Sequence, residues 1–320
     1  MKTAIRLALA LALSQSLSLA ASAPALAQQA PAAPNRFAAS IAPAERFEVA
    51  GMLVERHGNH GRPVVLIPGL ASGSWVWQDL IRRLMNESKD GRTLYVVTLP
   101  GFDGRPAPAG ASFAAARAAL VELVNTRRLA RPILVGHSMG GALALAVAQD
   151  LPDTVAGVIS VDGLPVFPGT EDLPPAQRPQ LAAGIRARLD AAAPVAYAEQ
   201  QRQYMRSQGV VDMGKADDLA ALALRSDRGA VGSYMADVFA LDLRPALPKI
   251  AAPVLVLVPY FEPDASQDRV SSALKVEHYR RLMAGTPKLE VKPVANARHF
   301  LMIDQPEALA DAVRGFIHHP

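Results

Sequence analysis

Short apolar runs alternate with segments of helical periodicity along most of the chain, from about residue 46 onward. The apolar runs predict buried strands, at 63–67, 93–99, 132–135, 155–161, 254–258 and 288–294. Apolar residues at helical spacing predict helices, at 74–85, 112–129, 140–149, 271–283 and 306–317. Ser74 is placed to cap the first of these helices. Strands that alternate with helices favour an α/β fold, with a mostly parallel sheet flanked by helices.

The alternation stops between about residues 164 and 246. Pro-rich turns there separate helical segments at 182–192, 196–208 and 216–225, without a convincing strand. The pattern predicts one domain over 44–318 that carries a helical insert at about 164–246. The Ala-, Pro- and Gln-rich stretch 28–43 has the composition of a flexible lead-in to that domain.

The first 27 residues differ in composition from the rest, because they contain no Asp or Glu. Lys2 and Arg6 precede an unbroken apolar run at 7–13, and a small-residue cleavage sequence ends at Ala27. This order is typical of a secretory signal peptide. The run is too short for a bilayer crossing, which needs about 20 apolar residues. The sequence therefore predicts cleavage after Ala27 and a periplasmic or secreted protein.

Composition excludes several functional classes. Half of the residues are hydrophobic and 19% are charged, which indicates a folded chain. The chain has no cysteine, which excludes disulfides, thiolate metal sites and a cysteine nucleophile. The net charge is +4, and the basic residues are scattered rather than clustered, so no nucleic-acid partner is expected. No metal or cofactor is expected either, because the histidines lack carboxylates at recognisable ligand spacing.

One motif carries chemistry. The sequence Gly-His-Ser-Met-Gly-Gly at 136–141 lies between a predicted strand and a predicted helix. A serine nucleophile needs a sharp, strained strand-to-helix turn, and glycines at its flanks permit close backbone approach. The unpaired N–H groups of the following helix then face developing negative charge. This context makes Ser138 the candidate nucleophile.

Four features in this order resemble the α/β-hydrolase fold family. They are the strand followed by Pro68-Gly69-Leu70, the turn at 99–102, the elbow around Ser138, and a late histidine. The resemblance covers nearly all of residues 46–318 and implies that the helical insert is a cap over the active site. It also implies Ser138 as the nucleophile.

The resemblance implies a general base beyond the last strand, where His299 stands just before the terminal helix. The other histidines do not fit the family's order; they are His57, His60, His137, His278, His318 and His319. His299 is therefore the predicted base.

The acid is ambiguous. The family usually has it in a Gly-x-x-Asp turn after the strand 254–258, but that turn reads Pro-Tyr-Phe-Glu here and ends at Glu262. Asp264 competes if the loop is reshaped. Asp162, at the end of the preceding strand, is where some members, the pancreatic-type lipases among them, place the acid. A purely structural Asp162 is the alternative. We favour Asp162, with Glu262 as the second candidate.

The oxyanion hole of the family uses two backbone N–H groups, which map to Leu70 and Met139. Trp75 and Trp77 follow the first of these loops and could either wall a pocket or pack in the core. The same two interpretations apply to apolar and aromatic residues of the insert, namely Phe167, Tyr197, Tyr204, Met205 and Met213.

The sequence thus predicts an exported serine hydrolase that cleaves a small carboxylic ester through an acyl-enzyme. Peptidase, carbon–carbon bond hydrolase and haloperoxidase-like activities share these motifs and stay open. Dehalogenases and epoxide hydrolases are disfavoured, because they need Asp at position 138. A non-catalytic binding protein on the same fold is the alternative of another class, supported by the degraded acid turn. The oligomeric state is left open.

Overall fold

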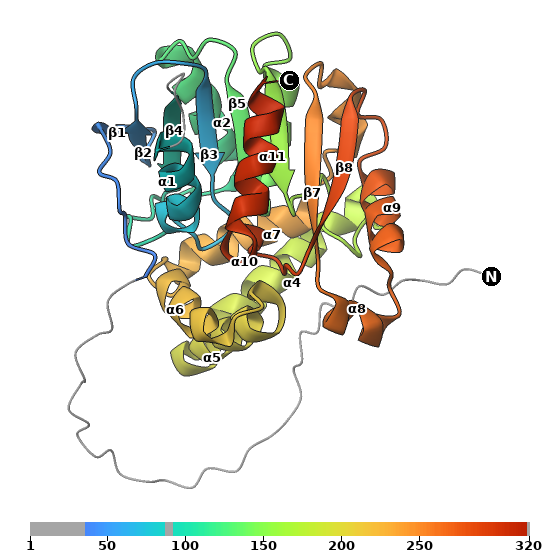
Figure 1. Cartoon of the computed structure of the whole chain (residues 1–320). Helices are drawn as coiled ribbons and strands as arrows, with labels where there is room; N and C mark the ends of the chain where they lie inside the picture. The colour runs from blue at the N-terminus through green and yellow to red at the C-terminus, as the bar shows by residue number, and fades with distance from the viewer. Residues whose placement is uncertain (1–35, 87–91, 319–320) are drawn as a thin grey trace, which may run out of the picture. The chain divides into compact units, whose positions relative to one another are not determined.

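The six predicted apolar strands lie side by side in an eight-stranded sheet of a computed structural model, which describes residues 36–86 and 92–318 (Figure 1). The strand order is β1-β2-β4-β3-β5-β6-β7-β8. The strands are β1 (Glu45–Val49), β2 (Met52–His57), β3 (Pro63–Ile67), β4 (Thr93–Thr98), β5 (Ile133–His137), β6 (Gly157–Val161), β7 (Val254–Tyr260) and β8 (Leu289–Ala295). The pairs β1–β2 and β2–β4 are antiparallel, and all other pairs of this sheet are parallel. The predicted fold class is confirmed.

Helices cover both faces of the sheet. They are the 3-10 helix η1 (Ser74–Trp77) and α1 (Gln78–Asn86), α2 (Phe113–Thr126), α3 (Met139–Asp150), α8 (Glu262–Asp268), α9 (Ser272–Leu282), α10 (Leu301–Asp304) and α11 (Pro306–His318). In Figure 1, α1 and α11 cross in front of the sheet and contact each other, while α2 lies behind it. The expected N-cap role of Ser74 is wrong: Gly73 precedes η1, Ser74 is its first residue, and the α-helix begins only at Gln78.

The segment between β6 and β7 is helical, and Figure 1 shows it beyond the carboxyl ends of the parallel strands. It contains η2 (Pro175–Gln177), α4 (Arg178–Ala191), α5 (Pro194–Tyr204), the π-helical turn η3 (Met205–Gly209), α6 (Met213–Ala223), α7 (Arg228–Ala240) and η4 (Arg244–Lys249). The sequence pattern did not predict α7. Gly229 and Gly232 weaken its helical propensity, but the Asp227 side chain accepts the Ala230 N–H at 2.8 Å and starts the helix.

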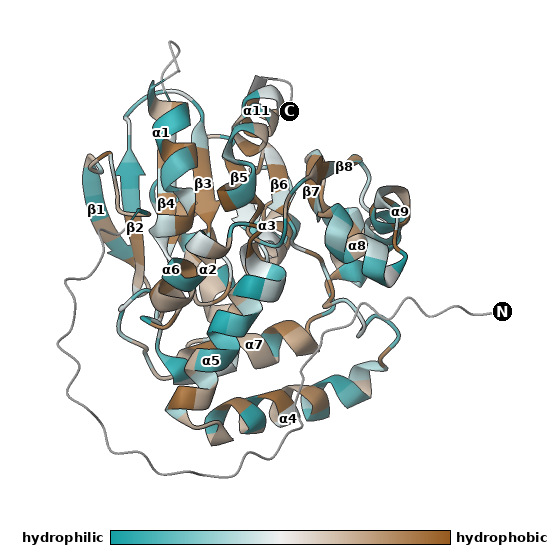
Figure 2. Ribbon diagram, turned by 60° about the horizontal axis from the view of Figure 1, so that its bottom comes forward, coloured by the Kyte–Doolittle hydropathy of each residue, from teal (hydrophilic) through white to brown (hydrophobic). Residues whose placement is uncertain are grey.

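The five central strands, β3 to β7, are almost wholly buried, which explains why their residues are mostly apolar. Figure 2 shows β3, β5 and β7 largely in brown, whereas teal is concentrated on the surrounding helices and on β1. Trp75 and Trp77 belong to this core, with 4% and 0% exposure. Trp75 lies between Phe37 and Phe300, at 6.4 Å between ring centroids in each case. The packing interpretation therefore describes both tryptophans.

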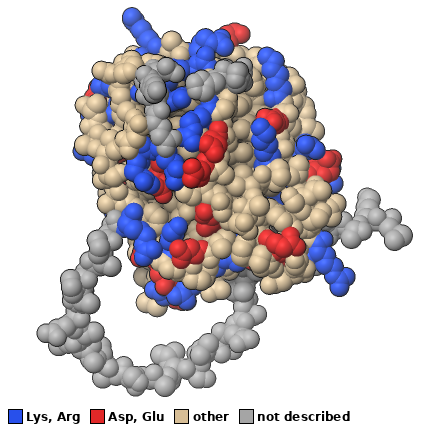
Figure 3. All heavy atoms as spheres, viewed as in Figure 1, with Lys and Arg blue, Asp and Glu red and all other residues tan. Residues whose placement is uncertain are grey.

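Charged side chains are mixed in sign on the face seen in Figure 3, where Lys and Arg lie among Asp and Glu. No helix within residues 36–86 and 92–318 combines the length and apolar character that a bilayer crossing demands. The predicted signal peptide 1–27 and most of the lead-in 28–43 lie outside the described residues, so both stay predictions.

Candidate active site

Ser138 occupies a strained backbone position between β5 and α3. Its φ of 55° and ψ of −120° lie in a region that non-glycine residues rarely adopt. The turn is tight because neighbouring backbone atoms leave no room for side chains. A Cβ on Gly136 would stand 2.0 Å from the Gly140 carbonyl oxygen, and one on Gly140 would stand 2.2 Å from the Ile67 carbonyl oxygen. The glycines of the motif are thus what permits this turn.

His299 lies in the loop between β8 and α10 and makes a hydrogen bond with Asp162. The distance from its Nδ1 to Asp162 Oδ2 is 2.6 Å, and the two side chains are 22% and 11% exposed. Two residues 137 positions apart in sequence therefore meet beyond the carboxyl ends of the strands, where ligands bind in open parallel sheets.

Asp162 directly follows β6 and has a left-handed backbone, with φ 52°. Its N–H donates to the Leu257 carbonyl of β7 at 3.0 Å, which fixes the residue at the sheet edge. Burial alone would raise the pKa of Asp162, but the hydrogen bond from His299 and the positive charge of Lys275 keep this pKa below its usual value. Asp162 is therefore a carboxylate at neutral pH and accepts a hydrogen bond from the Nδ1–H of His299.

The second oxygen of Asp162 accepts a hydrogen bond from the hydroxyl of Tyr279 on α9. Tyr279 is 4% exposed. Burial and the adjacent carboxylate raise the pKa of this phenol well above its usual value. Asp162 is thus bonded on both oxygens, to His299 and to Tyr279.

The competing acids are held elsewhere. Glu262, the first residue of α8, accepts from the Tyr260 hydroxyl and from Ser266 Oγ at 2.9 Å. Asp264 forms a two-point ion pair with Arg298, with both N–O distances 2.7 Å. Of the three candidate carboxylates, Asp162 is the one whose oxygen lies at hydrogen-bond distance from His299.

His137 connects the elbow to the His299 loop. Its Nε2 donates to the His299 carbonyl at 2.9 Å, and its ring centroid lies 4.6 Å from that of His299. Burial, reinforced by the neighbouring His299, lowers the pKa of His137 to about 3. His137 is therefore neutral and holds the loop of His299 beside the residue that precedes Ser138.

The insert is bonded to the same loop. The N–H groups of His299 and Phe300 donate to the carbonyls of Gln208 and Gly209, at 3.1 and 2.9 Å. Both acceptors belong to the π-helical turn η3, a geometry that often occurs at functional sites. Arg298 adds hydrogen bonds to the carbonyls of Arg206 and Val210, at 2.7 and 3.0 Å. The position of His299 therefore depends on the insert as well as on the sheet.

The two residues predicted for the oxyanion hole flank the elbow. Met139 is the first residue of α3, so its N–H is among those that a helix leaves without an intrahelical acceptor. Leu70 is half-buried in the loop after β3. That loop touches the elbow, because a Cβ on Gly69 would stand 3.1 Å from Ser138 Cβ.

The apolar and aromatic residues singled out in the insert have different positions. The Tyr204 ring meets His299 edge-on at 6.1 Å between centroids. Phe167 stacks on Phe239 at 3.9 Å. Tyr197 is buried under Arg228, whereas Met213 is 45% exposed. Among these residues, Tyr204 is the one in ring contact with His299.

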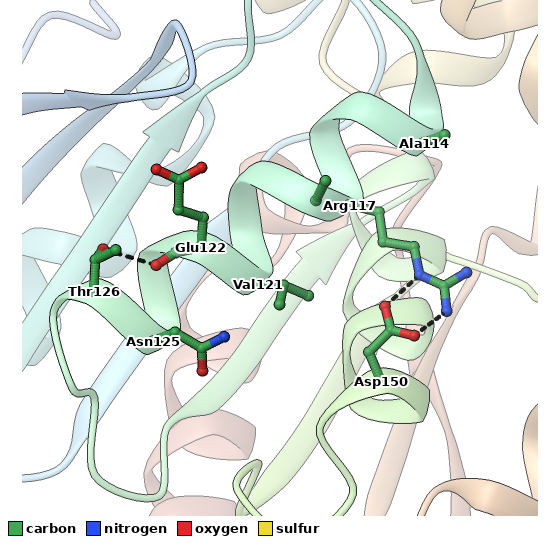
Figure 4. A pocket seen from close by; sticks show the side chains of 8 residues that line it. Ala114, Arg117, Val121, Glu122, Asn125, Thr126 and Asp150 are labelled. Atoms are coloured by element: carbon green, nitrogen blue, oxygen red, sulfur yellow. Dashed lines mark hydrogen bonds and ion pairs between the residues drawn. The ribbon is translucent and has the colours of Figure 1, made fainter.

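The described ranges contain no group of three or more His, Asp or Glu side chains that could hold a metal ion. A surface hollow of about 550 Å³ lies along α2 (Figure 4). Its lining includes the ion pair between Arg117 and Asp150 and the apolar side chain of Val121. None of the residues singled out from the sequence lines this hollow.

Comparison with known proteins places the chain in a family. The model of the alpha/beta hydrolase family matches residues 64–312, and the chain belongs to that family, as its motifs predicted. The biotin biosynthesis bifunctional protein BioHC of Cellvibrio japonicus is 28% identical over 263 residues, which are 80% of this chain and 47% of that protein. The pimeloyl-[acyl-carrier protein] methyl ester esterase of Yersinia enterocolitica is 32% identical over 126 residues, which are 39% of this chain and 45% of that protein. The chain thus spans about half the length of the curated relatives it matches.

Solved structures share the fold. An esterase from Exiguobacterium antarcticum superposes with a TM-score of 0.67 at 16% identity, over 87% of this chain and all of that chain. A thermophilic esterase from Thermogutta terrifontis has a TM-score of 0.64 at 23% identity, over 86% of this chain and 98% of that one. At these identities the likeness concerns the fold alone.

The neutral, buried His137 predicts a pH dependence of stability. Its pKa is depressed from 6.5 to about 3, so the unfolded state binds more protons than the folded state between these values. The free energy of unfolding should therefore fall as pH decreases from 6.5 towards 3. Urea unfolding at several pH values should show a smaller fall for His137→Gln than for the wild-type protein. The exposed His60→Gln is the matched control and should follow the wild type; a His137→Gln curve parallel to the wild-type curve would contradict the argument.

Proposed function

We propose that this protein hydrolyses a small carboxylic ester through Ser138, His299 and Asp162. The observation that carries the proposal is the Asp162–His299 hydrogen bond of 2.6 Å. The loop that contains His299 also accepts a hydrogen bond from His137, the residue before Ser138 in the strained turn. The pair supports an intact set of catalytic groups. It counters the binding-protein alternative, whose support was the degraded turn at Glu262.

The protonation states follow from the geometry. Because the Asp162 carboxylate accepts at Nδ1, the neutral His299 ring carries its proton there and its lone pair on Nε2. Nε2 is then the general base that takes the proton of Ser138 as Oγ attacks the ester carbonyl. Asp162 stabilises the imidazolium that forms. The same Nε2–H protonates the departing alkoxide, and an acyl-enzyme and an alcohol result.

Water completes the reaction. His299 removes a proton from a water molecule, which attacks the acyl carbonyl, and then returns that proton to Ser138 as the carboxylic acid leaves. The N–H groups of Met139 and Leu70 would hold the negatively charged oxygen in both steps. Each such donor typically contributes about 3–4 kcal/mol to the transition state.

Two further observations support the ester class. The relative from Yersinia enterocolitica is a methyl ester esterase, and its 32% identity over 126 residues makes an acyl ester the first substrate class to test. In addition, position 138 is Ser and not the Asp that dehalogenases and epoxide hydrolases use as nucleophile, which disfavours those two activities. Amides and lactones belong in the same substrate panel, because the proposed groups could attack these carbonyls as well.

We also propose that the protein is exported and cleaved after Ala27. The support is the order of positive, apolar and small residues along 1–27, which is typical of a secretory signal peptide. N-terminal sequencing of the protein recovered from the periplasm or medium should begin at Gln28. Recovery of the intact amino terminus from the cytoplasm would contradict this proposal.

Ser138→Ala tests the nucleophile. Turnover of a short-chain aryl ester should fall by about 10⁴-fold or more, because the attacking oxygen is lost while the fold remains. A fluorophosphonate should label the wild-type protein at Ser138 and leave the variant unlabelled, since only an activated serine reacts. Unchanged hydrolysis by Ser138→Ala, or labelling elsewhere, would overturn the assignment.

Asp162→Asn tests the acid. The amide removes the charge that orients His299 and stabilises its imidazolium, so kcat should fall by about 10⁴-fold. Glu262→Gln is the matched control, because this carboxylate accepts from Tyr260 and Ser266 instead, and its kcat should equal that of the wild type. Steady-state kinetics on one ester distinguishes the two; an equal loss in Glu262→Gln would return the acid to the turn after β7.

A further inference from the structure

The hydroxyl of Tyr279 is joined to the oxygen of Asp162 that does not contact His299. Tyr279 comes from α9, the second of the two helices between β7 and β8, whereas Asp162 follows β6. The side chain is 4% exposed, so its hydroxyl is confined to this contact. The helix α9 therefore contributes one buried hydrogen-bond donor to the Asp162 carboxylate.

We propose that Tyr279 is a positioning residue for ester hydrolysis, which fixes the orientation of the Asp162 carboxylate and withdraws part of its negative charge from the oxygen that faces His299. The proposal rests on the proposed function. Tyr279 touches neither substrate nor the reacting atoms, and it acts only through Asp162.

The position of Asp162 explains why its carboxylate needs a second hydrogen bond. The residue stands at a strand end with a left-handed backbone, and one hydrogen bond leaves its carboxylate free to turn about the terminal side-chain torsion. Bonds to both oxygens, from two different elements, leave one orientation. A phenol suits this role because it stays protonated: burial and the carboxylate both raise the pKa of Tyr279.

The other groups that act on Asp162 do not duplicate this bond. The titratable groups around its carboxylate are His299 from the loop before α10, Tyr279 and Lys275 from α9, Tyr204 from α5 and His137 from β5. The Lys275 ammonium donates to the Pro259 carbonyl at 2.6 Å and reaches Asp162 only through its charge. Tyr204 contacts the His299 ring edge-on.

The chain offers a matched control. Tyr260 also donates its hydroxyl to a carboxylate, that of Glu262, but this pair lies on the exposed surface beside the turn after β7. Tyr260→Phe and Tyr279→Phe thus remove the same atom from the same kind of hydrogen bond. They differ in which carboxylate loses its partner.

Tyr279→Phe should lower kcat on an aryl ester by about tenfold and leave KM unchanged, because the carboxylate samples orientations in which it does not face His299. The acidic midpoint of the kcat/KM profile should move up by about half a pH unit or more. Without the Tyr279 hydrogen bond, the Asp162 oxygen that faces His299 carries more negative charge, so the Asp162–His299 pair binds a proton more readily. Tyr260→Phe should match the wild type in both measurements. Wild-type kcat and midpoint in Tyr279→Phe would overturn the proposal.

A second substitution covers the case in which Tyr279→Phe does not fold. Site-specific replacement of Tyr279 by 3,5-difluorotyrosine keeps the shape of the ring and makes the phenol a stronger donor. The acidic midpoint should then move down, opposite to the shift in Tyr279→Phe. A shift upwards, or none, would contradict the proposed donor role.

Proton NMR distinguishes this inference from the proposed function. The His299 Nδ1–H should give a resolved downfield resonance in the wild-type protein that weakens by solvent exchange in Tyr279→Phe but not in Tyr260→Phe. If wild-type Ser138 takes no fluorophosphonate label, the esterase proposal fails, and the resonance still reports whether Tyr279 orders Asp162. If labelling succeeds and the resonance is the same in both variants, the role of Tyr279 alone is refuted.

Discussion

The backbone at Ser138 is the constraint around which the centre of this protein is built. A positive φ at a serine is unfavourable in isolation, by about 1–3 kcal/mol, and persists only where the surroundings determine it. Here those surroundings are backbone atoms of α3, of β3 and of Ser138 itself, which a Cβ on Gly136, Gly140 or Gly163 would approach to 2.0, 2.2 and 2.5 Å respectively. Packing of the sheet against α3 thus holds the backbone of Ser138 in this conformation at the amino end of α3.

The groups around this turn are joined in a closed set of contacts. His137 bonds to the carbonyl of His299, the His299 ring bonds to Asp162, and Asp162 follows the strand that pairs with β5. The insert completes the set, because the carbonyls of η3 accept the N–H groups of His299 and Phe300. A displacement of η3 would therefore shift the loop that carries the candidate base.

The candidate acid Asp162 lies at a different strand end from the one where the family usually carries this group. The turn after β7, where the family usually carries this group, has its carboxylates committed to other partners: Glu262 to Tyr260, and Asp264 to Arg298. Arg298 precedes His299 directly, so Asp264 still serves the loop of the base, through an ion pair with its neighbour. Asp162 lies one strand nearer to the elbow, and Tyr279 reaches back from α9 to meet it.

The sequence by itself determined the α/β class, the elbow around Ser138 and the family, because buried strands and tight glycine turns are local patterns. It did not identify α7, because the glycines of this helix lower its helical propensity while Asp227 caps its first turn. Nor did it identify the 3-10 turn that begins at Ser74. It also left Asp162, Glu262 and Asp264 in competition and gave no sign of His137 or Tyr279 as partners of the site. Those relations depend on contacts between residues more than a hundred positions apart, which follow from strand order and helix packing. Only the tertiary structure decided which carboxylate lies against His299, because that is a matter of distance across the sheet edge.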